Sequence, residues 1–373
     1  MRRALISLLA LVACSNPSEQ PAAPEDAATH ALEELAALGY VSFDEGAVEA
    51  HAATGEPHSA PFVYADDRRT IRRVANDGAV LASWTTPQFD QVEFAEPLSD
   101  GGVVCVSVDQ GIVRLDAESR PLWRFREPAH HEVALRPGGG FVVPVWREVN
   151  HRGRRVRFDE LVFLDAEGSV ERRWWTWDHR ELLADHHEPL PLDAAPVATT
   201  PSDTIYDQYH VNTIVVLREN QLGLGEPAES LLVCARNADL VFVLDVENDR
   251  ILWSFGPGEL DFPHTPTPVA GGVLIFDNGY HRGWSRLVEV DVKTRRIRWE
   301  WTAPTRAEFF SKTRGSAQRL SNGHTFVCES ERGRLFELSP SGEVVWSWVN
   351  PEMRSGKRRR IYRARRSVSL EGR

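Results

Sequence analysis

A short motif, in which an apolar run and a polar turn lead to a tryptophan, occurs six times in this chain of 373 residues. The copies include VANDGAVLASW, LDAEGSVERRW and LSPSGEVVW, and the six end at Trp84, Trp123, Trp174, Trp253, Trp299 and Trp346. Two β-rich runs separated by Asp, Asn, Gly or Ser predict a β-hairpin. The tryptophans lie 39, 51, 79, 46 and 47 residues apart, which fits about four strands per unit, with an insertion in the longest gap.

These repeats predict an all-β protein, a six-bladed β-propeller that spans residues 61–351 as one domain. Twelve tryptophans are present, and we expect the large rings to pack between neighbouring sheets. A net charge of −11 argues against nucleic acid as the main partner.

Residues 1–14 read as an export signal, with Arg2 and Arg3 before a short apolar run. Leu11 to Cys14 resembles a bacterial lipobox, which implies a lipid anchor at Cys14. Ser15 follows instead of Asp, which for such lipoproteins suggests sorting to the outer membrane. We therefore expect an exported, periplasmic protein held on the outer membrane. The alternative is an ordinary cleaved signal peptide in which Cys14 is incidental.

Two segments flank the predicted propeller. Residues 15–60 read as a flexible tether that includes a short helix at 29–39. Residues 352–373 form a basic tail, with eight Arg or Lys between 354 and 366. We expect this tail to be solvated, with contact to anionic lipid head groups as the alternative.

Each tryptophan phrase is preceded by another strand, which in a propeller lines the central channel. Three of these strands carry a histidine at about the same place: His131, His210 and His264. Histidines in register would converge on one channel mouth and act there as catalytic groups. The alternative is that they are structural histidines bonded to neighbouring loops.

Arginines and polar residues near these histidines are candidates for binding an anionic substrate. Arg282 and Arg286 follow a sharp turn that begins at Asp277, and Arg314 precedes a later inner strand. Their planar, permanently charged groups suit an oxyanion, although a surface charge or a clamp on the next blade is equally consistent. Asn212 and Asp277 complete the predicted substrate contacts.

The longest gap holds a histidine- and acid-rich loop between Trp177 and His210, which we expect to act as a lid over one face. His179, Asp185, His186, His187 and Glu188 lack the spacing of zinc sites. We expect no metal site and no cofactor.

Three segments together resemble the bacterial arylsulfotransferase family. They are Asp207 to Asn212, which matches a D-x-x-H-x-N motif, the segment FDNGYHRGWSR, and the segment from Phe309 to Pro351. The resemblance implies a six-bladed propeller that transfers a sulfuryl group from a phenolic sulfate ester to a phenol, without a nucleotide donor. It also implies a ping-pong reaction in which a histidine takes the sulfuryl group.

By this resemblance His210 corresponds to the histidine of the D-x-x-H-x-N motif, and His264 to the one that opens the next inner strand. Arg282 or Arg286 would be the sulfate-binding arginine. A further histidine is expected near Gly315, where this chain has Arg-Gly-Ser. The nucleophile is therefore left open among His264, His210 and His131, or is absent.

Two other functions remain open. A non-catalytic lipoprotein propeller that binds a ligand or partner is favoured by the missing histidine. A quinone-dependent dehydrogenase is weaker, because the repeats lack the regular eightfold pattern and no vicinal cysteine pair is present.

Overall fold

The computed structural model describes residues 51–65, 68–187, 196–200, 203–354 and 357–367, all of which belong to one compact unit of residues 45–373. The predicted leader, lipobox and helix at 29–39 lie outside the described residues. Strands dominate the described part of the chain, and no helix in it is long and apolar enough to cross a membrane.

Six sheets form the six blades, and within each blade neighbouring strands run antiparallel from the innermost strand outward. Blade 1 contains β29 (Ala364–Arg366), β2 (Phe62–Ala65), β3 (Thr70–Val74) and β4 (Val80–Thr85). Blade 2 contains β5 (Phe94–Pro97), β6 (Val103–Ser107), β7 (Gly111–Leu115) and β8 (Pro121–Phe125). Blade 3 contains β9 (Ala134–Leu135), β10 (Phe141–His151), β11 (Arg154–Leu164) and β12 (Val170–Trp175).

The remaining blades follow the same order. Blade 4 contains β15 (Val211–Val216), β16 (Leu231–Ala235), β17 (Leu240–Asp245) and β18 (Arg250–Phe255). Blade 5 contains β19 (His264–Val269), β20 (Gly272–Asp277), β21 (Arg286–Asp291) and β22 (Arg296–Trp301). Blade 6 contains β23 (Ser316–Arg319), β24 (Thr325–Glu329), β25 (Arg334–Leu338), β26 (Val344–Val349) and β1 (His51–Ala53). Short pieces are α2 (Arg180–Ala184), β27 (Met353–Arg354), β28 (Lys357–Arg358) and the 3₁₀ turns Arg236–Ala238, Arg306–Glu308 and Ser330–Arg332.

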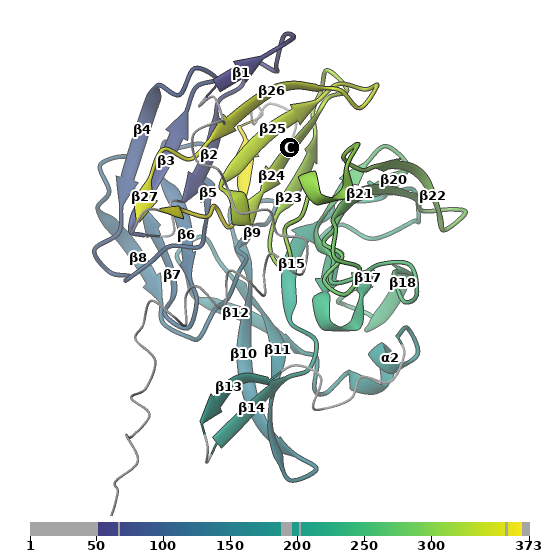
Figure 1. Ribbon diagram of the computed structural model, residues 1–373. Coiled ribbons are helices and arrows are strands. Elements are labelled where there is room, and N and C mark those ends of the chain that lie inside the picture. Colours follow the sequence, from purple (N-terminus) through teal and green to yellow (C-terminus); the bar gives the residue numbers. More distant parts are fainter. Residues whose placement is uncertain (1–50, 66–67, 188–195, 201–202, 355–356, 368–373) are drawn as a thin grey trace, which may run out of the picture. The chain divides into compact units, whose positions relative to one another are not determined.

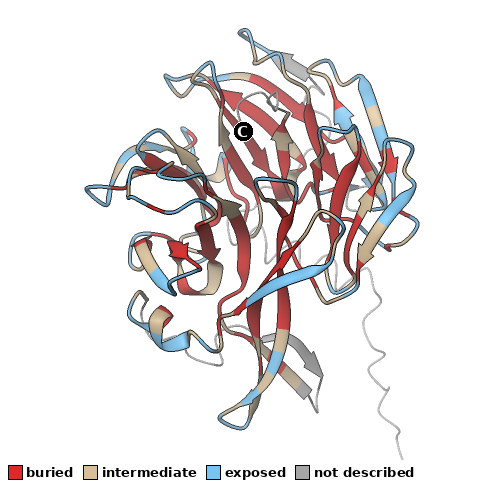
Figure 2. Cartoon of the chain, turned by 180° about the vertical axis from the view of Figure 1, so that it is seen from behind, coloured by how far each residue is buried: buried red, intermediate tan, exposed pale blue. Residues whose placement is uncertain are grey.

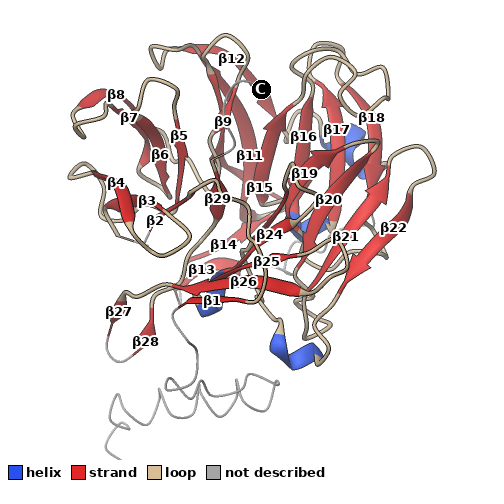
Figure 3. Ribbon diagram, turned by 90° about the horizontal axis from the view of Figure 1, so that it is seen from above, coloured by secondary structure: helices blue, strands red, loops and turns tan. Residues whose placement is uncertain are grey.

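This arrangement confirms the predicted six-bladed β-propeller. Figure 3 shows the sheets placed around a centre that β5, β9, β15, β19 and β29 approach. All six repeated tryptophans lie on the outermost strand of the meander that carries them, as the hairpin phrases predict.

The hydrophobic core lies in the seams between blades rather than at the centre. Six apolar clusters of described residues each combine side chains from two neighbouring blades, and the strands of Figure 2 are largely buried. Indole N–H groups tie some seams directly: Trp123 donates to the Ala166 carbonyl and Trp346 to the Asn76 carbonyl of the next blade. Packing of large rings between sheets is therefore confirmed.

The two ends of the described chain close the ring. The C-terminal strand β29 pairs with β2 as the innermost strand of blade 1, while β1 pairs with β26 at the outer edge of blade 6. Residues 357–367 thus differ from the expected solvated tail, because Arg363 and Arg366 lie inside the ring and are almost fully buried. Figure 3 shows β29 near the centre of the ring, and Figure 1 shows the neighbouring N-terminal strands in purple and blue.

The insertion in the longest gap extends blade 3. The hairpin of β13 (Pro196–Thr200) and β14 (Asp203–Asp207) adds to the sheet through a parallel pairing of β14 with β11, and these strands project from the ring in Figure 1. This pairing positions Asp207 at the start of the turn that leads into β15.

Candidate functional site

A cavity of about 320 Å³ opens where the inner strands begin, and we call it the mouth cavity. Three predicted histidines, His131, His210 and His264, line it together with Arg314. The other lining residues are Asp109, Trp146, Arg157, Arg236, Thr313 and Tyr362. The register read from the repeats therefore brings the three histidines to one place, although their roles stay predictions.

Left-handed backbone conformations occur at several of these positions. His131, His210 and Arg314 have φ angles of 57°, 54° and 70°, a region that residues other than glycine adopt infrequently. Such strain persists when the surroundings over-determine it, and it clusters at functional sites. Here it turns the chain sharply just before each inner strand.

His264 is held in one tautomer. Its Nδ1 lies 2.7 Å from Oδ1 of Asn278, and the Asn278 amide donates to the Ser311 and Arg314 carbonyls. Since Oδ1 can only accept, Nδ1 of His264 carries the hydrogen and Nε2 carries the lone pair. The Arg314 amide donates to that Nε2 at 3.2 Å. Burial, and then the charge of Arg236, hold the pKa of His264 well below its usual value, so the ring is neutral at pH 7.

His210 is paired with a buried carboxyl group. Its Nδ1 contacts Oδ2 of Asp207, which the turn between β14 and β15 places three residues earlier. Burial and the neighbouring Asp159 carboxylate raise the pKa of Asp207, while burial and the charge of Arg236 lower that of His210. The pair can therefore hold a dissociable proton between two nearly dry groups.

His131 is paired with a second carboxylate. Its Nδ1 lies 2.9 Å from Oε2 of Glu93, and its ring stacks on Tyr362 with centroids 5.2 Å apart. Burial lowers the pKa of His131 to about 4, against the opposing effect of Glu93. Burial would raise the pKa of Glu93, but its hydrogen bond with His131 and the charge of Arg314 bring it below its usual value. A neutral His131 with ionised Glu93 is the resting state at pH 7.

The cations of the mouth cavity differ in how far they are neutralised. Arg157 forms an ion pair with Glu148 at 3.3 Å, and Arg314 approaches Glu93 no closer than 3.9 Å. The Arg236 guanidinium bonds the neutral side chain of Asn237 and lies over the Phe262 ring. No carboxylate of the described residues forms an ion pair with Arg236, and burial lowers its pKa. Arg236 is thus the cation best suited to hold an anionic ligand.

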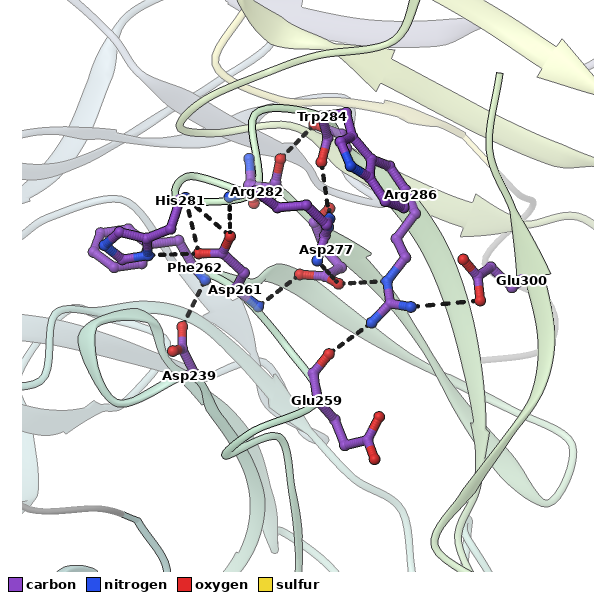
Figure 4. Close-up of polar contacts among 12 residues, drawn as sticks. Asp239, Glu259, Asp261, Phe262, Asp277, His281, Arg282, Trp284, Arg286 and Glu300 are labelled. Atoms are coloured by element: carbon purple, nitrogen blue, oxygen red, sulfur yellow. Dashed lines mark hydrogen bonds and ion pairs between the residues drawn. The ribbon is translucent and has the colours of Figure 1, made fainter. Parts of the chain in front are cut away.

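Arg282, Arg286 and Asp277 are not among the lining residues of the mouth cavity, and their role as substrate contacts stays a prediction. Asp277 is fully buried and binds both arginines, at 3.1 Å to Arg282 and 2.7 Å to Arg286. Next to them, Asp261 binds His281 at 2.9 Å. Figure 4 shows these five residues, which we call the hairpin cluster, with their charges directed at one another. These arginines, although well placed in the sequence, therefore have their charges neutralised by Asp277.

Two further sequence positions are explained by packing. Asn212 is fully buried beneath the mouth cavity, where its amide donates to the Pro263 carbonyl, so it is not among the lining residues. Gly315 has φ 111°, and a Cβ there would lie 2.8 Å from the Phe276 ring. A side chain at this position would therefore crowd the Phe276 ring and hold a strained φ angle, so the packing here favours glycine.

Six lining residues were missed by sequence reasoning, and Trp146, Arg236 and Tyr362 are among them. Arg236 follows the apolar run of β16 directly, a position that could have been found by asking which cations end the second strand of a blade. Tyr362 belongs to the segment taken for a tail, and nothing in its sequence context indicates a return to the ring. The hydroxyl of Tyr362 and Nε1 of Trp146 are buried without a partner among the described residues.

The predicted lid follows a different course over the part that is described. His179 binds Asp249 at 3.1 Å and His186 binds Ser254 at 3.0 Å, so residues 177–187 lie against the outer hairpin of blade 4. Glu188 lies outside the described residues. No group of three metal-type ligands occurs in the part of the chain that the structure covers.

A second cavity, of about 350 Å³, lies in the seam between blades 1 and 2. Trp84, Glu96 and Arg365 are among its lining residues, and no histidine lines it. We place the chemistry at the mouth cavity, because the groups with shifted pKa values converge there.

Comparisons with known proteins agree with this fold. A family described as arylsulfotransferase (ASST) matches residues 95–351, which is more than half of the chain. A protein of unknown function from Bacteroides caccae superposes with a TM-score of 0.54 at 14% sequence identity, covering 82% of this chain and 98% of that one. Streptogramin B lyase gives 0.46 at 11% identity, covering 82% and 90%, and the WD40 propeller of Doa1 gives 0.45 at 13%, covering 82% and 88%. No curated protein matches the sequence.

Proposed function

Because the chain belongs to the arylsulfotransferase family, we propose that its mouth cavity transfers a sulfuryl group from a phenolic sulfate ester to a phenol, without a nucleotide donor. His264 accepts the group and passes it on. The observation that carries the proposal is a neutral imidazole of fixed tautomer in the same cavity as Arg236, a half-buried cation whose own hydrogen bonds go to a neutral amide.

The nucleophile is Nε2 of His264. Its lone pair is set by the Nδ1 hydrogen bond to Asn278 at 2.7 Å, and a neutral imidazole is a competent nucleophile. Before substrate binds, the Arg314 amide donates to this lone pair. Binding of the ester displaces that long contact, and the same N–H is then placed to donate to a sulfuryl oxygen.

Charge in the transition state falls on the oxygens of the sulfuryl group, as in phosphoryl transfer. Arg236 and Arg314 are among the lining residues of the cavity, and neither has a close ion pair with a described carboxylate. Preorganised cationic donors in a buried site stabilise such charge strongly.

The Asp207–His210 pair handles the proton. When Nε2 of His264 attacks sulfur, the S–O bond to the aryl group breaks and its electron pair stays on the phenolate oxygen. Nε2–H of His210 gives its proton to that oxygen, while the Asp207 proton moves to Nδ1 of His210 across their hydrogen bond. The incoming phenol reverses each step, so the pair ends with the proton it began with.

A binding protein without catalysis is the second candidate. Two observations favour it: the lone pair of His264 is already an acceptor, and a packed glycine stands at position 315. Under this alternative the mouth cavity holds an aryl sulfate without cleaving it.

The deciding experiment is to trap the enzyme-bound sulfuryl group. The protein is mixed with 4-nitrophenyl sulfate without acceptor, and nitrophenolate release is followed alongside intact mass. We expect one stoichiometric burst, a mass increase of one sulfuryl group, and its location on His264 by peptide mapping at alkaline pH. His264→Ala should bind the ester but give neither burst nor adduct.

Other outcomes of this experiment are equally clear. An adduct on His210 or His131 contradicts the choice of nucleophile. Binding of the ester without burst or adduct, over a panel of aryl sulfates, favours the non-catalytic alternative.

We further propose that the protein acts in the periplasm, held on the outer membrane by a lipid at Cys14. The support is the leader and lipobox sequence of residues 1–14. Cys14→Ser should release the protein from the membrane fraction, and retention of this variant on the membrane would contradict the anchor.

A further inference from the structure

The C-terminal strand supplies a cation beneath the mouth cavity. Arg363 directly precedes β29, just as His210 precedes β15 and Gly315 precedes β23. Its side chain is completely buried, so blade 1 presents an arginine directly before its innermost strand, where blade 4 presents His210. Because Arg363 does not line the cavity, its role must pass through neighbouring residues.

Its guanidinium group bonds to both histidine-bearing segments. Nη1 pairs with the Glu132 carboxylate, which is also fully buried. Nη2 donates to the Asn212 carbonyl at 3.1 Å and to Oγ1 of Thr213 at 3.0 Å. Glu132 follows His131 in the chain, and Asn212 and Thr213 come just after His210.

The same network continues to the third histidine. Oγ1 of Thr213 also accepts from the Thr265 amide at 3.1 Å and donates to Oδ1 of Asn212 at 3.0 Å. Thr265 follows His264 and has φ 44°. One arginine and one hydroxyl therefore connect the residues that follow all three histidines.

We propose that Arg363 is a positioning residue that fixes the spacing and orientation of His131, His210 and His264. The proposal rests on the function proposed above. Two of these histidines have left-handed φ angles, which the surroundings must hold against the usual preference. One nitrogen of the planar guanidinium group can bond a carboxylate while a second nitrogen bonds two further oxygen atoms. Lysine cannot reproduce that geometry.

A matched control exists on the same strand. Arg366 is also fully buried and pairs with a fully buried carboxylate, Glu337, at 2.9 Å. Its other contacts are the Ala60 carbonyl and Asn76, and neither adjoins a histidine of the cavity. Loss of either arginine removes a buried ion pair and lowers stability, although Glu132 keeps Arg365 at 3.7 Å and Glu337 keeps His324 at 2.7 Å. Only the loss of Arg363 should disturb the histidines of the mouth cavity.

The experiment compares Arg363→Met and Arg366→Met in the full-length protein. Melting temperature, kcat and KM are measured, and histidine side chains labelled with ¹³C are titrated by NMR, with His131→Gln and His210→Gln as assignment variants. We expect both variants to lower the melting temperature. Arg363→Met should also reduce kcat at least tenfold, with a smaller effect on KM, and shift the His131 and His210 resonances, whereas Arg366→Met should leave them in place.

Equal changes in both variants, or wild-type resonances in Arg363→Met, overturn the proposal. If Arg363→Met does not fold, Arg363→Lys and Thr213→Val take its place. Lysine should keep Glu132 paired and shift mainly His210, and Thr213→Val should shift His210 and His264. The NMR readout needs no turnover, so it decides about Arg363 even if the wild-type protein transfers no sulfuryl group.

Discussion

The mouth cavity and the hairpin cluster contain the same kinds of side chain but differ in how their charges are arranged. In the hairpin cluster, Asp277 neutralises Arg282 and Arg286, and the Asp261–His281 pair is largely open to solvent on its histidine side. In the mouth cavity, Arg236 has no close carboxylate partner among the described residues, and the Asp207–His210 pair is buried.

The two groups adjoin at Phe262, whose ring lies under Arg236 and against His281. The comparison shows that residue type and chain position alone do not identify a substrate-binding arginine. The deciding property is whether a carboxylate forms an ion pair with the arginine in the folded protein. Arg236 is half-buried and forms no ion pair with a described carboxylate, so its guanidinium group can still bind an anion.

The largest expected effect is the difference between replacing a histidine of the mouth cavity and replacing a histidine of the hairpin cluster. His264→Ala should lower kcat/KM about 10⁴-fold or more, as for other covalent nucleophiles. His281→Ala, in the hairpin cluster, should change it less than about threefold, because this exposed side chain lies outside the cavity. Steady-state assays with an aryl sulfate and a phenol measure both, and equal losses would contradict the assignment.

The second largest difference is expected between the arginines of the two groups, in activity and in stability. Arg236→Met is expected to lower kcat by about 10²–10³-fold, the usual cost of losing one oxyanion donor. Its free energy of unfolding should change by less than about 1 kcal/mol, because no ion pair is lost and the side chain is only half-buried. Denaturant titration and kinetics of the same preparation test this, and a large loss of stability would show that Arg236 is structural.

Arg286→Met should behave in the opposite way. The buried Asp277 loses one of its two cations, and we expect a loss of about 2 kcal/mol in unfolding free energy with kcat unchanged. Urea denaturation gives the stability. A fall in kcat of tenfold or more in the folded variant would restore Arg286 as a substrate ligand.

The smallest effect, about tenfold per pH unit, comes from the buried Asp207–His210 pair. Because burial raises the pKa of Asp207 above its usual 3.8, the pair loses its proton only when the pH rises through this shifted value. The donor step needs the proton, so kcat/KM for a donor with a basic leaving group should fall as the pH rises. The acceptor step needs the deprotonated pair, so kcat/KM for the phenol should rise over the same range.

Ping-pong kinetics with each substrate varied separately measure the two profiles. In Asp207→Asn both pH dependences should disappear. Parallel profiles for donor and acceptor would contradict the role of the pair.

The periodic parts of this protein can be predicted from its local sequence patterns. Each tryptophan phrase is a local hairpin, and a hairpin follows from turn residues and alternating apolar side chains that are close in the chain. Six copies with one register were enough to predict six blades and to align His131, His210 and His264 at a common mouth. Arg314 was also identified in this way.

Which arginines are free of ion pairs, and how the ring closes, depends on contacts made in the folded protein. Arg282 and Arg286 are paired because β20 and β21 place Asp277 between them, while Arg236 has no such neighbour. The basic C-terminal segment adds a strand to the ring. There Arg363 pairs with the buried Glu132, and Arg366 pairs with the buried Glu337. These contacts join residues that are far apart in the chain, so no local pattern records them.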